Sequence, residues 1–130
     1  MILLREGMAV IPLEQSGVPL ERRFAFYDQC HTTGMDIKHK LNACAALTLG
    51  KDMVFRDYSQ GAFRMRGIGK GQTIHLFIVP EVKQLISTQM AEGNGEHVAE
   101  REKRIAALPA AERAGWMLRD VTGWLCINSM

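Results

Sequence analysis

The sequence lacks the features of a secreted or membrane-spanning protein. Its three cysteines are an odd number without a paired spacing, which argues against a disulfide framework and for a reducing, intracellular setting. No apolar run approaches the roughly 20 residues that a membrane-spanning helix needs. Residues 1–4 are apolar, but Arg5 and Glu6 follow at once, so no signal-peptide core is expected. We therefore expect a cytoplasmic protein that makes no contact with a membrane.

Excess charge of one sign is also missing. Sixteen Lys and Arg against fourteen Asp and Glu leave a net charge of +2, which is too weak to argue nucleic-acid binding from charge alone. The sequence does have 47% hydrophobic and 23% charged residues, which excludes a disordered chain. Its 130 residues suit one domain. Composition thus indicates an ordinary globular domain and leaves its function to local motifs.

Strand and helix patterns alternate through the middle of the chain. Strands are predicted from β-branched, aromatic or small apolar runs at residues 24–27, 43–49 and 73–79. The apolar spacing from Phe55 to Met65 predicts an amphipathic helix that ends in the glycine-rich residues 67–71. Strands that alternate with helices predict an α/β fold with a parallel sheet and right-handed crossovers.

The two ends of the chain have a different character. Residues 8–13 have the pattern of a short strand, in an N-terminal extension that we place at residues 1–23. Pro80 predicts the start of a helix, which Gly93 and the following Asn-Gly pair break. The charge-dense stretch that follows predicts a solvated helix or helix pair interrupted near Pro109. We therefore expect an α/β part at residues 24–92 and a charged helical tail at residues 93–130.

A polar segment follows the first predicted strand and contains Thr33, Gly34 and Asp36. Open α/β sheets bind ligands at the carboxyl ends of their strands, so we expect this segment at such an end. Gly34 permits a tight turn whose N–H groups and hydroxyls can face an anion. Asp36 can accept hydrogen bonds from ribose hydroxyls or orient a basic residue. An ordinary turn after a strand is the alternative.

A basic segment follows the second predicted strand. Gln60 and Arg64 are four residues apart and share a face of the predicted helix, while Arg66 and Lys70 project from its end and from the glycine-rich turn. Cations gathered at a loop edge repel one another unless an anion lies between them. Phosphate fits because a guanidinium binds it through two hydrogen bonds. A solvated basic helix end, favoured by the helix dipole, is the alternative.

Taken together and in this order, the two segments resemble the fifth and sixth conserved motifs of superfamily-two helicases. The matching residues are Thr33-Gly34-Met35-Asp36 and Gln60…Arg64-x-Arg66-Gly67-x-Gly69. The resemblance implies the second RecA-like domain of the P-loop NTPase type, whose Gly-x-Asp turn couples nucleotide state to a nucleic-acid or polypeptide track. It also implies that Gln60, Arg64 and Arg66 reach ATP bound on the first domain, with one arginine as a finger on the γ-phosphate.

Three blocks resemble a narrower family more closely, namely very large eukaryotic proteins with a helicase-like core, many of them labelled ubiquitinyl hydrolase. The blocks are residues 27–38, 45–53 and 64–72. This resemblance implies that the chain is the ATP-sensing and coupling half of a helicase-like ATPase, part of a much larger protein and inactive alone. It implies a first RecA-like domain as partner, which holds Mg²⁺, and a track or ubiquitin as a further partner.

The sequence departs from the helicase pattern at two points. Phe63 precedes Arg64 where glycine is usual, Gly67 stands in the place of the second arginine, and Arg66 comes one residue early. The chain also has no P-loop, because residues 67–73 have the wrong spacing and precede a strand. An acidic strand-end motif for Mg²⁺ is missing as well. The chain therefore supplies at most one wall of an ATP site.

The family label raises a cysteine deubiquitinase as an alternative function. Cys30 would be the nucleophile, and a histidine with an aspartate would complete the triad. His31 is adjacent to Cys30 and would point to the opposite side of an extended segment. Nothing in the spacing selects among the other candidates, which are His39, His75 and His97 with Asp28 or Asp36. A non-catalytic interaction module is a third possibility.

Two further groups of residues have simpler explanations. The spacing of His31, His39 and Cys44 matches no zinc pattern and lacks a fourth ligand, so no metal site is predicted. Trp116 and Trp124 are eight residues apart on one helical face, which predicts a place in the core.

Overall fold

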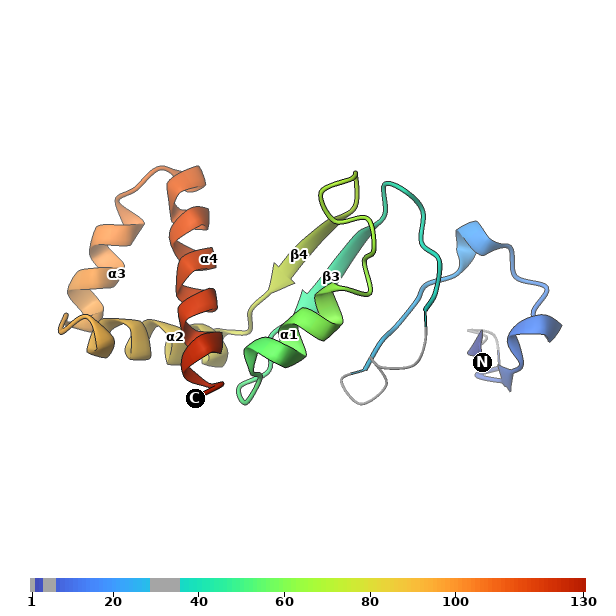
Figure 1. Cartoon of the computed structure of the whole chain (residues 1–130), viewed down its shortest axis with the longest axis horizontal. Helices are drawn as coiled ribbons and strands as arrows, with labels where there is room; N and C mark the ends of the chain where they lie inside the picture. Colours follow the sequence, from blue (N-terminus) through green and yellow to red (C-terminus); the bar gives the residue numbers. More distant parts are fainter. Residues whose placement is uncertain (1, 4–6, 29–35) are drawn as a thin grey trace.

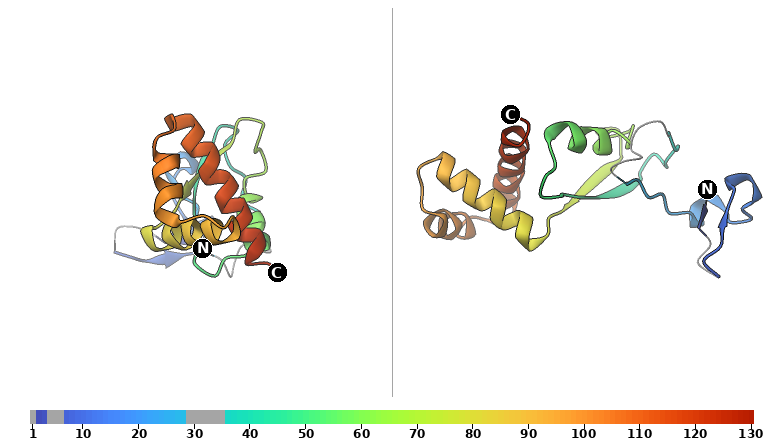
Figure 2. Two further views of the ribbon diagram at one scale, coloured as in Figure 1. Left: turned by 90° about the vertical axis from the view of Figure 1, so that its left-hand side faces the viewer. Right: turned by 90° about the horizontal axis from the view of Figure 1, so that it is seen from below.

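The chain is an elongated arrangement of three parts in sequence order. The computed structural model describes residues 2–3, 7–28 and 36–130. Helices α2–α4 form one end, β3 and β4 with α1 lie in the middle, and the N-terminal segment lies at the other end (Figure 1). Figure 2 shows the same order from below. The part that carries the two predicted motifs thus lies between the helices and the N-terminal segment.

The middle part is a β-α-β unit. β3 (Cys44–Thr48) pairs in parallel with β4 (Thr73–Phe77), and the register runs from Cys44↔Thr73 to Thr48↔Phe77. Helix α1 (Phe55–Ala62) makes the crossover between them. Along both strands exposed and half-buried residues alternate, so one face of the sheet packs inward and the other stays open. The predicted α/β class with a parallel sheet is therefore confirmed, with two strands in that sheet among the described residues.

The strand predicted at residues 24–27 is wrong. Residues 23–28 have no regular secondary structure, and Phe24 and Phe26 are 88% and 77% exposed. An aromatic run satisfies strand propensity, but a strand forms only beside another strand. In the N-terminal extension, the short strand expected at residues 8–13 is reduced to β2 (Val10–Ile11), which pairs antiparallel with β1 (Ile2–Leu3). Two 3₁₀ turns follow at Leu13–Gln15 and Leu20–Arg22.

Helix α1 is shorter than its apolar spacing predicts. At its start, the Asp57 carboxylate accepts a hydrogen bond from the Val54 N–H at 3.3 Å. Its C-cap is Phe63, and two further turns follow, in which Arg64 N–H bonds to Gly61 O and Met65 N–H to Ala62 O. Arg64 and Arg66 therefore lie beyond the helix and not on it, which corrects the predicted shared helix face of Gln60 and Arg64.

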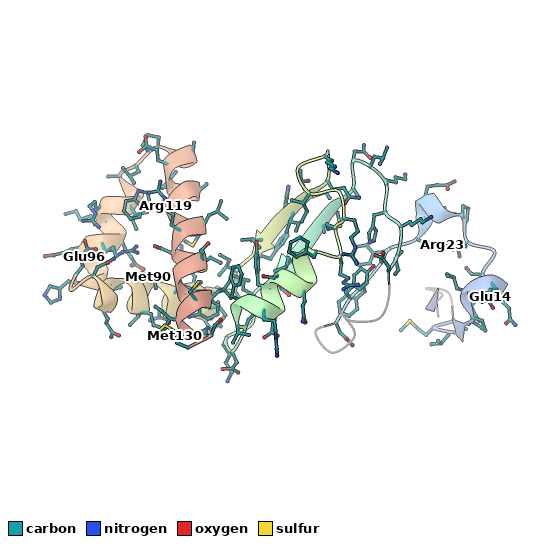
Figure 3. The ribbon with its side chains drawn as sticks, viewed as in Figure 1. Glu14, Arg23, Met90, Glu96, Arg119 and Met130 are labelled. Atoms are coloured by element: carbon teal, nitrogen blue, oxygen red, sulfur yellow. The ribbon has the colours of Figure 1, made fainter. Side chains whose placement is uncertain are left out.

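The C-terminal part consists of α2 (Pro80–Gly93), α3 (Val98–Ala106) and α4 (Ala110–Ile127). Pro80 is the first residue of α2, where its missing N–H costs no hydrogen bond. The predicted breaks after Gly93 and near Pro109 are confirmed, and Pro109 is the N-cap of α4. Helix α2 packs against α4 closely, since a Cβ on Gly123 would lie 3.1 Å from the Met90 sulfur (Figure 3).

One hydrophobic core joins the sheet to the helices. Its buried members come from the end of β3, from α2 and from α4, and they are Leu49, Val82, Ile86, Val121, Trp124 and Leu125. Polar contacts add to this junction at the end of α4. The Asn128 amide donates to Met53 O at 3.1 Å, and the Phe55 N–H donates to the Ser129 hydroxyl at 3.0 Å. The β-α-β unit and the helices therefore pack as one body.

Within the described ranges, no helix combines the length and the apolar character needed to cross a membrane.

Candidate functional site

One described residue from each predicted motif, Asp36 and Arg66, lies on a segment that leads into the amino end of a parallel strand, and the two residues are in contact. The Arg66 Nε–H donates to Asp36 Oδ1 at 3.3 Å, and both side chains are more than half exposed. Residues 36–43 lead into β3, and residues 63–72 lead into β4. Because the strands are parallel, both segments enter the sheet at the same end, where the two strands begin. The expected position at the carboxyl end of a strand is therefore wrong, since the aromatic run that supported it is no strand.

A buried glutamine ties the two segments together. Gln72 is 7% exposed, and its side chain crosses from one segment to the other. Its Oε1 accepts from the Gly67 N–H at 2.7 Å, and its Nε2 donates to Lys40 O at 2.8 Å. Both ends of this amide are therefore satisfied, as a buried amide requires.

The glycine-rich loop has a defined conformation. Gly67 O accepts from the Lys70 N–H at 2.9 Å and from the Gln72 N–H at 3.1 Å, which closes the loop on itself. Gly71 has φ +112°, and a Cβ at this position would lie 2.9 Å from Leu41 O. Glycine is therefore required at residue 71 by both its conformation and its contact. The loop that follows Arg66 is held against the segment that follows Asp36.

Gln60 and Arg64 lie close together at the end of α1. The Arg64 Nε is 3.5 Å from Gln60 O, and both residues are half-buried. Arg64 has a further interaction besides this one. Of the other predicted site residues, Thr33 and Gly34 lie outside the described residues. The structure thus places Asp36, Gln60, Arg64 and Arg66 on two neighbouring segments.

The groups proposed for thiol or metal chemistry are scattered or not described. Cys30 and His31 lie outside the described residues. The His39 Nε2 is 3.4 Å from the Tyr27 hydroxyl, His75 lies on the exposed face of β4, and His97 is the N-cap of α3. In the part of the chain that the structure describes, no group of three His, Cys, Asp or Glu side chains is placed to hold a metal ion.

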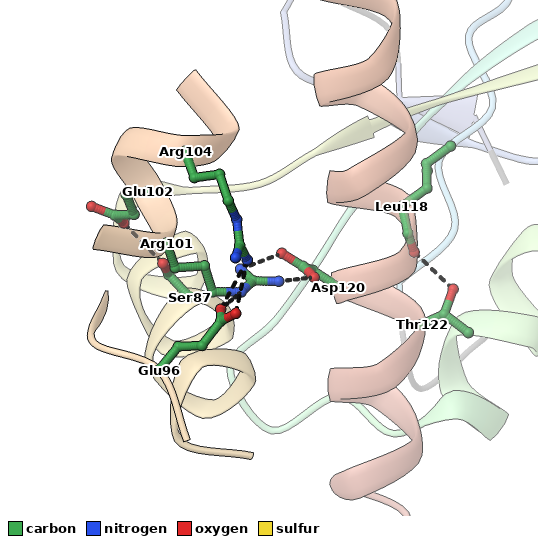
Figure 4. A network of polar contacts seen from close by, with 8 residues as sticks. All are labelled: Ser87, Glu96, Arg101, Glu102, Arg104, Leu118, Asp120 and Thr122. Carbon is green, nitrogen blue, oxygen red and sulfur yellow. Dashed lines mark hydrogen bonds and ion pairs between the residues drawn. The ribbon is translucent and has the colours of Figure 1, made fainter. Parts of the chain in front are cut away.

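A buried ion pair in the helical part escaped the sequence analysis. Arg101 on α3 donates to both carboxylate oxygens of Asp120 on α4, at 2.9 and 2.6 Å (Figure 4). The Arg101 side chain is 2% exposed, and its hydrogen bonds to Asp120 raise the pKa of Arg101. Glu96 lies beside this pair, 3.6 Å from Arg101, and also bonds Arg104. The charge-dense tail gave no signal that singled out these residues.

The pair connects α3 to α4. A cavity of about 340 Å³ lies beside it between α2, α3 and α4, lined among others by Lys83, Arg113 and Met117. The Asp36–Arg66 contact is not part of this cavity. Trp116 is half-buried next to Arg101, with the guanidinium 5.9 Å from the ring centre, while Trp124 is fully buried. The prediction of core positions thus holds fully for Trp124 alone.

No family model, curated protein or solved structure matches the chain. The chemistry of the site therefore follows from its own geometry.

That geometry is suited to an anion. Asp36 holds the Nε edge of the Arg66 guanidinium, and among the described residues no hydrogen bond engages its two Nη groups. Lys70 lies four residues further along, on the exposed glycine-rich loop. A guanidinium held by a carboxylate on one edge can present its other edge to a phosphate.

Proposed function

We propose that the chain is the ATP-sensing and coupling half of a helicase-like ATPase. In this proposal Arg64 and Arg66 face the γ-phosphate of an ATP molecule bound by a first RecA-like domain. One observation carries the proposal. Asp36 and Arg66 belong to the two motif-like segments, lie 30 residues apart in sequence, and are in contact. A turn that reports nucleotide state must touch the residue that reaches the nucleotide.

The surroundings of the site support a partner protein. Leu41, Phe63 and Ile68 lie on the same two segments as the cations, and all three are exposed. Exposed apolar side chains gathered on neighbouring segments are typical of protein interfaces. A site made of cations within an apolar surface suits a cleft between two domains better than an isolated phosphate site.

The role of each residue follows from its position. Arg64 and Arg66 stabilise the negative charge that develops on the transferred phosphoryl group. Asp36 orients Arg66, so any movement of the segment that carries Asp36 changes the direction of the guanidinium. The P-loop and the Mg²⁺ that phosphoryl transfer requires belong to the first domain in this proposal.

A second candidate is a non-catalytic interaction module. The exposed Phe24 and Phe26 favour it, because two such aromatic side chains on one extended segment are costly to leave in water. In that case the cations would serve a protein interface and would not act on ATP. The deubiquitinase alternative depends on Cys30, which lies outside the described residues.

The direct test is binding of tripolyphosphate, which mimics the phosphate chain of ATP, measured by calorimetry on the purified chain. We expect a dissociation constant of roughly 1 mM, equivalent to about 4 kcal/mol. Arg66→Gln should weaken binding at least roughly fivefold, because it removes the charge and the planar fork. Arg113→Gln, an exposed arginine of α4, is the matched control and should leave binding unchanged. Equal binding by all three proteins would refute the proposal.

A further inference from the structure

We infer that Gln72 is a positioning residue that sets the contact between Arg66 and Asp36. The inference deepens the proposed function, on which its phosphate-binding test rests. Among the described residues, no hydrogen bond joins Gln72 to either side chain of that pair. Gln72 bonds the backbone of Gly67, next to Arg66, and the backbone of Lys40, four residues after Asp36.

The connections are short on both sides. Gly67, which donates to Gln72, directly follows Arg66, and Lys40, which accepts from it, comes four residues after Asp36. The amide therefore joins the segment that carries Asp36 to the segment that carries Arg66. A change in the length or chemistry of this side chain alters how far apart the segments lie.

The site requires the particular chemistry of glutamine. One end of the side chain must accept a hydrogen bond from an N–H, and the other must donate one to a carbonyl oxygen. Methionine has a similar length but offers neither group in useful strength. A glutamate carboxylate can accept from Gly67 but cannot donate to Lys40. Since Gln72 is buried, water is poorly placed to replace either partner.

Gly67 offers a second and independent way to break the same connection. A Cβ at this position would lie 2.9 Å from the Gln72 Cδ and 3.0 Å from its Oε1. Gly67→Ala therefore pushes the Gln72 side chain out of place and leaves its chemistry intact. No left-handed backbone conformation is recorded for Gly67, so alanine meets a side-chain clash without backbone strain.

A purely structural role of Gln72 and a positioning role lead to different expected results. Both predict a lower thermal midpoint when Gln72 is replaced. Only the positioning role predicts that the folded variant loses the Arg66–Asp36 contact. The Arg66 Nε–H signal in a nitrogen–proton NMR spectrum reports this contact directly, because a hydrogen-bonded Nε–H differs in chemical shift and exchange rate from a solvated one.

The experiment compares Gln72→Met and Gly67→Ala with wild type, well below their melting temperatures. The controls are Gln84→Met on the exposed side of α2 and Gly50→Ala, where a Cβ meets nothing within 4 Å. We expect both test variants to move the Arg66 Nε–H signal to the position of a solvated arginine. We also expect them to weaken tripolyphosphate binding at least threefold, whereas both controls should resemble wild type.

The outcomes separate the two claims. If wild type does not bind tripolyphosphate, the proposed function fails, and the Arg66 signal alone still decides the role of Gln72. If wild type binds through Arg66 but both test variants keep the signal and the affinity, the inference about Gln72 is wrong and the proposed function stands. If one test variant fails to fold, the other decides the question, because Gln72→Met and Gly67→Ala break the same connection independently.

Discussion

At the scale of single residues, Arg66 is the side chain on which the proposed function depends most. Asp36 fixes one edge of its guanidinium, and lysine in its place would keep the charge but lose the planar fork. In a protein that contains this chain together with a first RecA-like domain, we expect Arg64→Lys or Arg66→Lys to lower ATP turnover at least roughly tenfold. The thermal midpoint of Arg66→Lys should stay unchanged, because Arg66 is exposed and substitutions of exposed residues alter stability by less than about 0.5 kcal/mol.

Both rates should be measured beside the thermal midpoint of each variant. Normal turnover in both would mean that the basic cluster is solvated surface. The resemblance to helicases would then concern the fold alone.

Arg101 offers a residue-scale test of stability, separate from function. Arg101→Met leaves the Asp120 carboxylate buried without its cation, and we expect the free energy of unfolding to fall by about 3–5 kcal/mol. The double variant Arg101→Met with Asp120→Leu should recover much of this loss, because it removes both charges. Urea unfolding of the three proteins measures the effect. A single variant as stable as wild type would show that the pair contributes nothing.

The pH dependence of this loss follows from the raised pKa of Arg101. A group whose pKa is raised in the folded state stabilises the fold below its unfolded pKa and loses that effect only as the pH passes the folded value. For arginine both values lie in strongly alkaline solution. The stability difference between wild type and Arg101→Met should therefore be the same at pH 7 and pH 9, and a difference that shrinks over this interval would contradict the assignment.

At the scale of elements, the alternation along β3 leads to a paired prediction. Leu47 points toward the core that α1 and the C-terminal helices share, while Thr48 lies on the open face of the sheet. Leu47→Ala should lower the free energy of unfolding by about 2–3 kcal/mol, since it removes packed methyl groups. Thr48→Ala is the matched control, for which we expect a change within about 0.5 kcal/mol. If urea unfolding shows the same loss of free energy for both variants, the side chains of the two sheet faces contribute equally to stability, and the prediction is wrong.

The elements that could be predicted from the sequence have local causes. The strands at residues 43–49 and 73–79 and the helix starting at Pro80 appear with boundaries moved by at most two residues at either end. Each is set by apolar periodicity or by a proline, which act within one turn of the chain. The helix before the glycine-rich loop ends three residues before Met65, because the chain turns to bring Arg66 toward Asp36.

The features that could not be predicted depend on distant partners. The aromatic run at residues 24–27 has strand propensity but no neighbouring strand to pair with. The contact of Asp36 with Arg66 and the two-sided role of Gln72 join residues about 30 positions apart. Arg101 and Asp120 are buried because two helices close over them, which no local pattern in a charge-dense stretch reveals.

At the scale of the whole molecule, the candidate site lies away from the hydrophobic core. The hydrophobic core lies where the carboxyl end of β3 meets α2 and α4, whereas Asp36 and Arg66 lie on the segments that lead into the amino ends of the strands. Arg66 therefore contributes little to folding and is available for a partner. Among the described residues, one face of the parallel sheet is open, although parallel sheets are usually covered on both faces. This open face and the exposed cations both fit a chain that works against another domain.

The isolated chain should therefore hydrolyse no ATP. Phosphoryl transfer needs a cradle for the phosphates, a metal ion and a positioned nucleophile, and charge stabilisation by arginines alone supplies only part of this. The sequence contains no Gly-x-x-x-x-Gly-Lys-Ser/Thr run, and residues 67–73 form a glycine-rich turn that enters a strand where a P-loop enters a helix. We expect the purified chain, mixed with ATP and Mg²⁺, to release phosphate no faster than a sample without protein. The Arg66→Gln variant should release phosphate at the same background rate. Steady release by the chain that Arg66→Gln abolishes would show that one wall of the site suffices for catalysis. Such a result would overturn the assignment of the remaining groups to a first domain.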